Sequence, residues 1–155
     1  MKVVSVRFIN ESNILSDAIQ WDTWGRWSHV EFIFSDGYFG SRFNGGVKLR
    51  PFDYIKVKNS LECHVEVSDD QYTLIYDFLK KQDGKPYDKT SILGFIIHRD
   101  WKSDDSWFCS ELVAAAFLEA GIALLRTTDV NRISPRDLSL SPLWIVEKET
   151  RGYHG

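Results

Sequence analysis

Apolar and polar residues alternate near the start of the chain. Val4, Val6 and Phe8 are separated by single polar residues. A period of two places alternate side chains on one face of a β-strand. The pattern predicts a half-buried first strand within residues 1–9.

Six further short segments are predicted as strands, at residues 28–34, 38–43, 47–50, 54–58, 62–67 and 144–146. In the first of these, alternation turns Val30, Phe32 and Phe34 toward the core. The same alternation leaves His29 and Glu31 together on the opposite face. Polar side chains on a shared face of a strand are candidates for a site.

Apolar residues at helical spacing predict three helices and one shorter turn or helix. Their predicted starts are Asn10 or Ser12, the cluster Ser68-Asp69-Asp70, Ser106, and Ser134-Pro135. Gly84 and Gly121 close the second and third helices. Strands flanked by helices, without a repeat or linker, predict one α+β domain over residues 1–155.

Composition and charge exclude several classes of protein. The chain has 155 residues, of which 43% are hydrophobic and 14% aromatic, as in a folded domain and unlike a disordered segment. The net charge is −3 and both signs are mixed along the chain, so we expect no nucleic-acid partner. The N-terminal segment is too short and too alternating for a signal peptide, and no apolar run approaches the length of a membrane span. We therefore expect no integral membrane segment and a cytoplasmic location, with any export by another route such as phage delivery or lysis.

Cys109 is a candidate nucleophile at the start of the third predicted helix. With Ser106 as the N-cap, Cys109 occupies the third helical position. Unpaired N–H groups and the helix dipole stabilise an anion there, so a lowered thiol pKa and an oxyanion site are both expected. The alternative is that Cys109 is a small buried apolar residue. The other cysteine is Cys63, and we expect both thiols to be reduced.

His29 is the candidate base for this thiol. An isolated histidine on a strand is alternatively a surface or packing residue. A base also requires a group that orients its ring. Glu31 is the carboxylate close to His29 in sequence and on the same face.

The hairpin after His29 leaves the orienting group open. Asp36-Gly37 is a strong hairpin signal, and a two-residue loop there sets Asn44 opposite His29. A three-residue loop shifts the register by one and places Ser41 diagonally across from His29. Glu31 keeps its position in either register.

The remaining polar residues predict no second site. Cys63 and His64 are adjacent in a strand and therefore point to opposite faces. His98 and His154 have no partners at metal-ligand spacing, so we predict no metal and no cofactor. Gly45-Gly46 lacks the strand-to-helix context of a phosphate loop, and a sharp turn is predicted there.

Five motifs resemble the circularly permuted papain-like branch of the NlpC-type cysteine hydrolases, which is related to the lecithin retinol acyltransferase group. The resemblance extends from about residue 19 to residue 121, and in it the histidine strand precedes the cysteine helix, the reverse of the ordinary papain order. The motifs are Trp27-Ser28-His29-Val30-Glu31, Asp36-Gly37, Gly45-Gly46-Val47, Gly84-Lys85-Pro86-Tyr87-Asp88 and Phe108-Cys109-Ser110-Glu111-Leu112-Val113.

The resemblance implies a papain-like fold in permuted order, with an antiparallel sheet packed against helices. It implies that Cys109 is the nucleophile and His29 the general base. A third polar residue stands on the following strand in the family, and ungapped matching puts Ser41 where a His or Glu is usual. Glu31 and Asn44 are the alternatives for this role.

Three residues are candidates for contact with substrate. Tyr87 matches a tyrosine segment that lies near the substrate groove in similar proteins. Trp27 belongs to a cluster of tryptophans before His29, for which core packing is the alternative to a groove wall. Ser110 follows the nucleophile.

The expected function is hydrolysis of an amide or ester through an acyl-enzyme. By resemblance, the expected substrate is a cell-wall peptide amide. One alternative is a lipid acyltransferase or phospholipase of the lecithin retinol acyltransferase type. The other is a binding module that keeps the fold and has lost the chemistry.

Overall fold

The computed structural model describes residues 1–10, 26–87, 108–126 and 133–152. These residues form the strands and helices of an α+β fold. In chain order they are β1 (Lys2–Asn10), β2 (His29–Phe34), β3 (Gly37–Arg42), β4 (Gly46–Arg50), β5 (Asn59–Val67), α2 (Asp69–Gln82), α4 (Cys109–Glu119), α5 (Pro135–Ser139) and β6 (Ile145–Thr150). The helix predicted after Asn10 or Ser12 lies outside the described residues.

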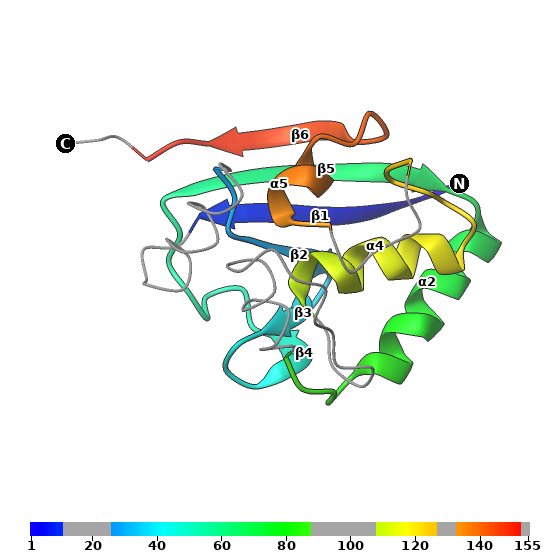
Figure 1. Cartoon of the computed structure of the whole chain (residues 1–155), viewed down its shortest axis with the longest axis horizontal. Coiled ribbons are helices and arrows are strands. Elements are labelled where there is room, and N and C mark those ends of the chain that lie inside the picture. The colour runs from blue at the N-terminus through cyan, green and yellow to red at the C-terminus, as the bar shows by residue number, and fades with distance from the viewer. Residues whose placement is uncertain (11–25, 88–107, 127–132, 153–155) are drawn as a thin grey trace.

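The strands make one six-stranded antiparallel sheet in the order β4-β3-β2-β1-β5-β6. Figure 1 shows α2, α4 and α5 on one side of this sheet. The α+β class and the antiparallel sheet packed against helices are thus confirmed for the part of the chain that is described.

The two central strands carry an apolar face and a polar face. Phe8 pairs with Val30, and Phe32 stacks on Phe117 of α4 with ring centroids 6.1 Å apart. Each such apolar side chain, fully buried, contributes about 1.5 to 3 kcal/mol to folding. One residue along, Arg7 pairs with Glu31 on the opposite face. The alternation predicted from the sequence therefore holds on both strands.

The register of the hairpin between β2 and β3 differs from both registers predicted from the sequence. Phe34 pairs with Gly37, so the loop is Ser35-Asp36 and not Asp36-Gly37 or the three residues 35–37. Gly37 is required here because a Cβ at this position would lie 2.1 Å from the carbonyl oxygen of Arg50 on β4. This close approach fixes which residue ends the turn.

Residues 54–58 do not form the strand predicted for them. Residues 51–58 make turns and irregular structure, in which the N–H of Tyr54 donates to the carbonyl of Pro51 at 3.1 Å. The phenol of Tyr54 reaches the polar face of the sheet and bonds the Glu31 carboxylate. A partly buried side-chain hydrogen bond, rather than a ladder of backbone bonds, thus holds this segment.

Gly45-Gly46 forms the predicted sharp turn. Both residues have positive φ angles, 92° and 66°. A Cβ on Gly46 would lie 2.3 Å from the carbonyl oxygen of Lys85. Val47 exchanges two backbone hydrogen bonds of 2.8 Å with the 84–85 segment. The turn therefore brings the segment that precedes Tyr87 against β4.

The helix starts follow their capping residues. Ser68 caps α2 in a capping box with Gln71, as the Ser68-Asp69-Asp70 cluster predicts. The start of α4 differs from the prediction: Phe108, with extended backbone angles, is the N-cap, and Cys109 is the first helical residue rather than the third. The Glu111 side chain accepts from the Phe108 N–H at 3.4 Å, which gives α4 its start without a capping serine. The predicted cap, Ser106, lies outside the described residues.

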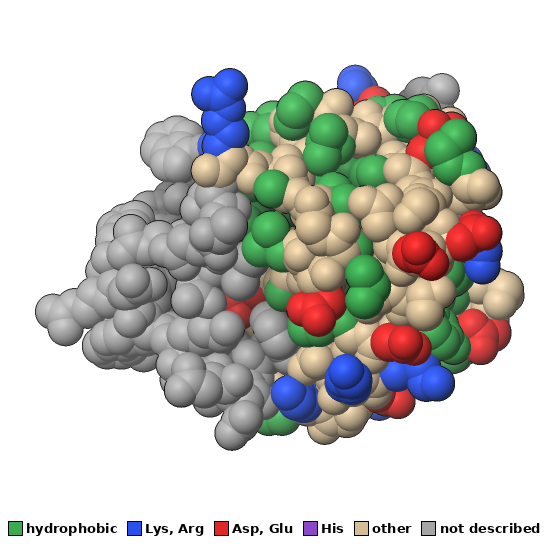
Figure 2. Space-filling view, turned by 90° about the vertical axis from the view of Figure 1, so that its right-hand side faces the viewer, with side chains coloured by type: hydrophobic (Ala, Val, Ile, Leu, Met, Phe, Trp, Pro, Cys, Tyr) green, Lys and Arg blue, Asp and Glu red, His purple; other side chains and the backbone are tan. Residues whose placement is uncertain are grey.

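The described helices are short, and the surface seen in Figure 2 is mixed in character. Within residues 1–10, 26–87, 108–126 and 133–152, no helix is both long and apolar enough to cross a bilayer. Figure 2 shows the side that carries α2 and the N-terminus, where acidic, basic and apolar side chains are interspersed.

Candidate active site

Cys109 begins α4 and its sulfur lies against β2. The sulfur accepts hydrogen bonds from the backbone N–H groups of Val30 and Ser110. Val30 directly follows His29, and the ladder between β2 and β3 begins only at Phe32. The helix start thus brings Cys109 to the end of β2 that carries His29.

The Cys109 thiol is enclosed, with 1% of the residue exposed. Burial raises its pKa to about 12. The N–H groups of Val30 and Ser110 and the charge of Arg42 act in the opposite direction, whereas the charge of Glu111 adds to the increase. The expected lowering of the pKa is therefore wrong for this closed arrangement, because loss of hydration outweighs the donors at the helix start.

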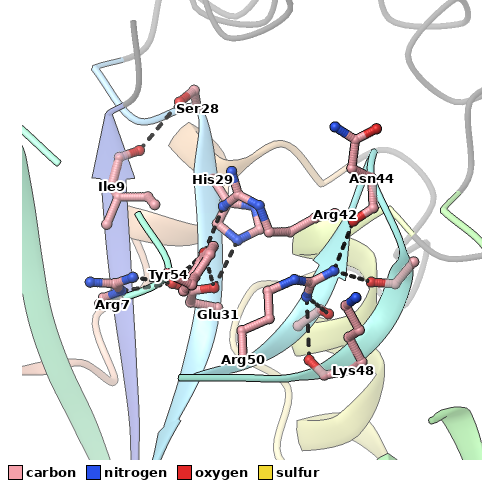
Figure 3. A network of polar contacts seen from close by, with 12 residues as sticks. Arg7, Ile9, Ser28, His29, Glu31, Arg42, Asn44, Lys48, Arg50 and Tyr54 are labelled. Carbon is pink, nitrogen blue, oxygen red and sulfur yellow. Dashed lines mark hydrogen bonds and ion pairs between the residues drawn. The ribbon is translucent and has the colours of Figure 1, made fainter. Parts of the chain in front are cut away.

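His29 and Glu31 contact one another on the polar face of β2 (Figure 3). The imidazole Nε2 lies 3.2 Å from Oε2 of Glu31. Both side chains are buried, at 7% and 0% exposure. The period of two in the strand explains the contact, because residues two apart share a face. Glu31 is thus the carboxylate that contacts the ring, and it does so at Nε2.

The Glu31 carboxylate receives donors from two further elements. Arg7 on β1 approaches Oε1 with Nε at 2.7 Å and Nη2 at 2.6 Å. The Tyr54 hydroxyl lies 2.8 Å from Oε2 and 3.1 Å from Oε1, and it accepts from Nη1 of Arg42 at 2.7 Å. Gly40 leaves room for this carboxylate, because a Cβ there would lie 3.0 Å from that of Glu31.

These contacts keep Glu31 ionised inside the protein. Burial opposes the charge, but the hydrogen bond and charge of His29, the charge of Arg7 and the Tyr54 hydroxyl together lower the pKa of Glu31 from 4.5 to about 2. Burial and the neighbouring carboxylate raise the pKa of Tyr54. The phenol therefore stays protonated at neutral pH.

The lowered pKa of Glu31 predicts a loss of stability in acid. A carboxyl group with a lowered folded pKa contributes stability above its unfolded pKa, and this contribution is lost as the pH falls from 4.5 to about 2. The expected contribution is about 3 kcal/mol. Urea unfolding between pH 6 and pH 2 measures it, with Glu31→Gln as the reference. Equal pH dependence in the two proteins would contradict the prediction.

The alternative orienting residues lie elsewhere. Ser41 is fully buried and lies on the same face of β3 as Phe39. Arg42 lies on the other face of β3, where it bonds to Tyr54. Asn44 is exposed, and its backbone carbonyl accepts from Arg50 at 3.1 Å. Figure 3 shows the Asn44 side chain directed away from Glu31. The register with the Ser35-Asp36 loop explains why neither residue is next to the His29–Glu31 pair.

The three predicted substrate contacts have different surroundings. The Tyr87 ring packs against Phe108, the residue before Cys109, with centroids 5.7 Å apart. Trp27 is buried at 5% exposure beneath the Arg26 guanidinium. The Ser110 hydroxyl is buried and donates to the carbonyl of Ile133, which ties α4 to the segment before α5. Tyr87 therefore contacts the N-cap of α4, whereas Ser110 belongs to the first turn of that helix.

Arg7 and Tyr54 are site residues that sequence reasoning missed. The alternation of β1 puts Arg7 on the polar face, but the contact with Glu31 depends on the β1–β2 register. Tyr54 was missed because residues 54–58 were predicted to form a strand. The available signal was an arginine at a polar position of a predicted strand.

A groove of about 700 Å³ lies at a different place, between α2 and the turn from β2 to β3. Cys109, His29 and Glu31 do not line it. Its described lining includes Phe34, Phe39, Tyr72, Tyr76, Lys80 and Asp83. This groove is therefore separate from the candidate site at Cys109.

The other cysteine lies within a strand and not at the start of a helix. Cys63 is a free, buried thiol on β5, and burial raises its pKa to about 12. His64 points to the opposite face of β5, as predicted, and lies 2.6 Å from a carboxylate oxygen of Glu147. In the described ranges no three His, Cys, Asp or Glu side chains are grouped as metal ligands. His98 and His154 lie outside those ranges.

Comparison with known proteins identifies a shared fold. No family model and no curated protein matches the sequence. The chain is similar to the crystal structure of the metalloprotein yiiX from Escherichia coli O157:H7, described as DUF1105, with a TM-score of 0.76 and 20% sequence identity. The match covers 97% of this chain and 98% of that one. At this identity the likeness shows the fold alone.

Proposed function

We propose that this protein is a cysteine hydrolase that cleaves an amide or ester bond through an acyl-enzyme. One observation carries the proposal: the Cys109 sulfur lies against the N–H of Val30, the residue next to His29, whose ring is held by Glu31. A nucleophile, a base and an orienting carboxylate are the parts that acyl transfer requires.

In the proposed reaction, His29 takes the thiol proton as the Cys109 sulfur bonds to the carbonyl carbon. The oxyanion is stabilised by N–H groups in the first turn of α4, which have no partner within the helix. The carbon–nitrogen or carbon–oxygen bond then breaks, and His29 returns the proton to the leaving group. Water, deprotonated by His29, attacks the thioester and releases the acid with the free thiol.

The raised pKa of Cys109 determines how the proton moves. At neutral pH the resting sulfur is a thiol, so proton transfer to His29 accompanies the attack instead of preceding it. The sulfur is also enclosed, and its contact with a carbonyl requires the atoms that cover it to move apart. We propose that substrate binding and thiol activation are coupled in this way.

The proposed architecture is the papain-like fold in permuted order. Its support is the order of the elements, with the histidine strand β2 before the cysteine helix α4, on one antiparallel sheet. By the same resemblance, the proposed substrate class is a cell-wall peptide amide.

A second candidate is a binding module without catalysis. The observation that favours it is the enclosed thiol with its raised pKa. Such a module needs neither the His29–Glu31 contact nor a reactive sulfur, so chemistry at Cys109 separates the two candidates.

The test uses p-nitrophenyl acetate as an ester probe and purified peptidoglycan as an amide substrate. A Cys63→Ser background removes the second thiol. We expect hydrolysis of the ester probe, and its complete loss after treatment with iodoacetamide. Full hydrolysis after complete alkylation of Cys109 would exclude the thiol mechanism, and an absence of any esterase or amidase activity would favour the binding module.

A further inference from the structure

Glu31 has more donors than an orienting carboxylate needs. Its Oε2 contacts His29 and the Tyr54 hydroxyl, and its Oε1 contacts the Arg7 guanidinium. These donors come from β1, β2 and the 51–58 segment. Every side chain of the Arg7–Glu31–His29 line is buried, so their charges interact in a medium that screens them weakly.

We propose that Arg7 and Tyr54 are positioning residues that balance the Glu31 charge, so that Glu31 orients the His29 ring without holding it as the imidazolium. This inference rests on the proposed function, because a general base must be neutral before it accepts the thiol proton.

Electrostatics supplies the reason for a balancing cation. A buried carboxylate at hydrogen-bond distance from an imidazole stabilises the protonated ring, and a base that is already protonated cannot take a proton. Arg7 lies 2.6 to 2.7 Å from the other oxygen of the same carboxylate, which offsets this effect. The pair thus gives Glu31 a hydrogen-bonding role toward His29 with little net charge.

Arg7 is built into the fold for this position. Its guanidinium carbon lies 3.3 Å from the centre of the Tyr38 ring, so the cation is stacked and cannot swing away from Glu31 freely. A stacked, forked guanidinium holds its direction better than a lysine ammonium. Lysine at this place is therefore not an equivalent residue.

Tyr54 couples a second cation to the same carboxylate. Its hydroxyl donates to Glu31 and accepts from Nη1 of Arg42. The ionisable side chains of this network, among the described residues, are thus His29 and Glu31 on β2, Arg7 on β1, Arg42 on β3 and Tyr54. Loss of the Tyr54 hydroxyl removes one donor and leaves more negative charge for the imidazole.

The test follows the titration of the His29 ring by NMR, without substrate. The chain has four histidines, and the His29 signal is assigned by its disappearance in His29→Gln. We expect Tyr54→Phe to move the titration midpoint up by about 0.5 pH units and Arg7→Gln by about 1 unit, whereas Glu31→Gln moves it down. In active protein, the acid limb of the kcat/KM profile is expected to move in the same directions.

Tyr38→Phe is the matched control, because it removes a hydroxyl from the same face and keeps the ring under Arg7. It is expected to leave the midpoint unchanged. If Tyr54→Phe lowers the melting temperature and leaves the midpoint of His29 in place, Tyr54 is merely structural and the proposal is overturned. Should Arg7→Gln not fold, Tyr54→Phe decides alone. Since the titration needs no turnover, a failed hydrolase assay and a failed charge balance give separate results.

Discussion

Cys109→Ser is expected to lower kcat/KM for p-nitrophenyl acetate by about 10⁴-fold at neutral pH, while the protein stays folded. The hydroxyl occupies nearly the same space as the thiol, so packing at the start of α4 is retained. It is a much weaker nucleophile, and a base tuned to a thiol does not compensate. Steady-state kinetics in the Cys63→Ser background measures the change.

Cys63→Ser provides the matched control for this substitution. Cys63 is also free and buried, and burial raises its pKa to a similar extent, but the imidazole of the neighbouring His64–Glu147 pair points to the opposite face of β5. We expect Cys63→Ser to keep the kcat/KM of the original protein. Activity that survives in Cys109→Ser, or disappears in Cys63→Ser, would show that the nucleophile has been assigned to the wrong residue.

Arg7→Met is expected to lower the free energy of unfolding by about 3 to 5 kcal/mol, the largest stability effect in the site. The substitution leaves Glu31 charged, fully buried and without its nearest cation. The cost arises from the isolated charge rather than from the lost pair itself. Denaturation by urea at pH 7, followed by circular dichroism, measures it.

A second substitution separates the two causes. In Arg7→Met/Glu31→Gln the stranded charge is gone, so we expect the double variant to be more stable than Arg7→Met alone. Arg151→Met is the control, because its pair with Glu149 is exposed and is expected to leave stability nearly unchanged. A double variant less stable than either single variant would contradict a stranded charge as the cause.

The fold was predictable where a pattern is local. Alternation in residues 28–34 predicted both faces of β2, and the Ser68 cluster predicted the start of α2. Gly45-Gly46 predicted a turn, since positive φ angles favour glycine. Each of these signals depends on residues close to one another in the chain.

The rest depends on contacts between distant segments. The β2–β3 loop is Ser35-Asp36 because Gly37 approaches Arg50, which no local turn preference reveals. Tyr54 does not belong to a strand, and its hydroxyl instead bonds to Glu31. The helix α4 begins at Cys109 because the Glu111 side chain accepts from the N–H of Phe108, the N-cap. The thiol pKa was predicted in the wrong direction because burial cannot be read from the helix position.

The three candidate residues were predicted from the sequence, whereas the residues around them were not. Cys109, His29 and Glu31 were identified from residue type and order, and the structure brings Glu31 to His29 and the Cys109 sulfur to the neighbouring amide. Arg7 was missed because its contact with Glu31 depends on the register between β1 and β2. The pairing of the Arg7 and Glu31 charges could therefore be recognised only from the structure.

Peptide mapping after brief exposure to p-nitrophenyl acetate tests whether Cys109 and His29 act together as nucleophile and base. The experiment compares the Cys63→Ser protein with the same protein carrying His29→Ala. We expect an acetyl group on the peptide that contains Cys109, formed at least about 100-fold more slowly without His29. Acetylation of Cys109 at equal rates in both proteins, or of other residues only, would contradict a nucleophile and base acting together.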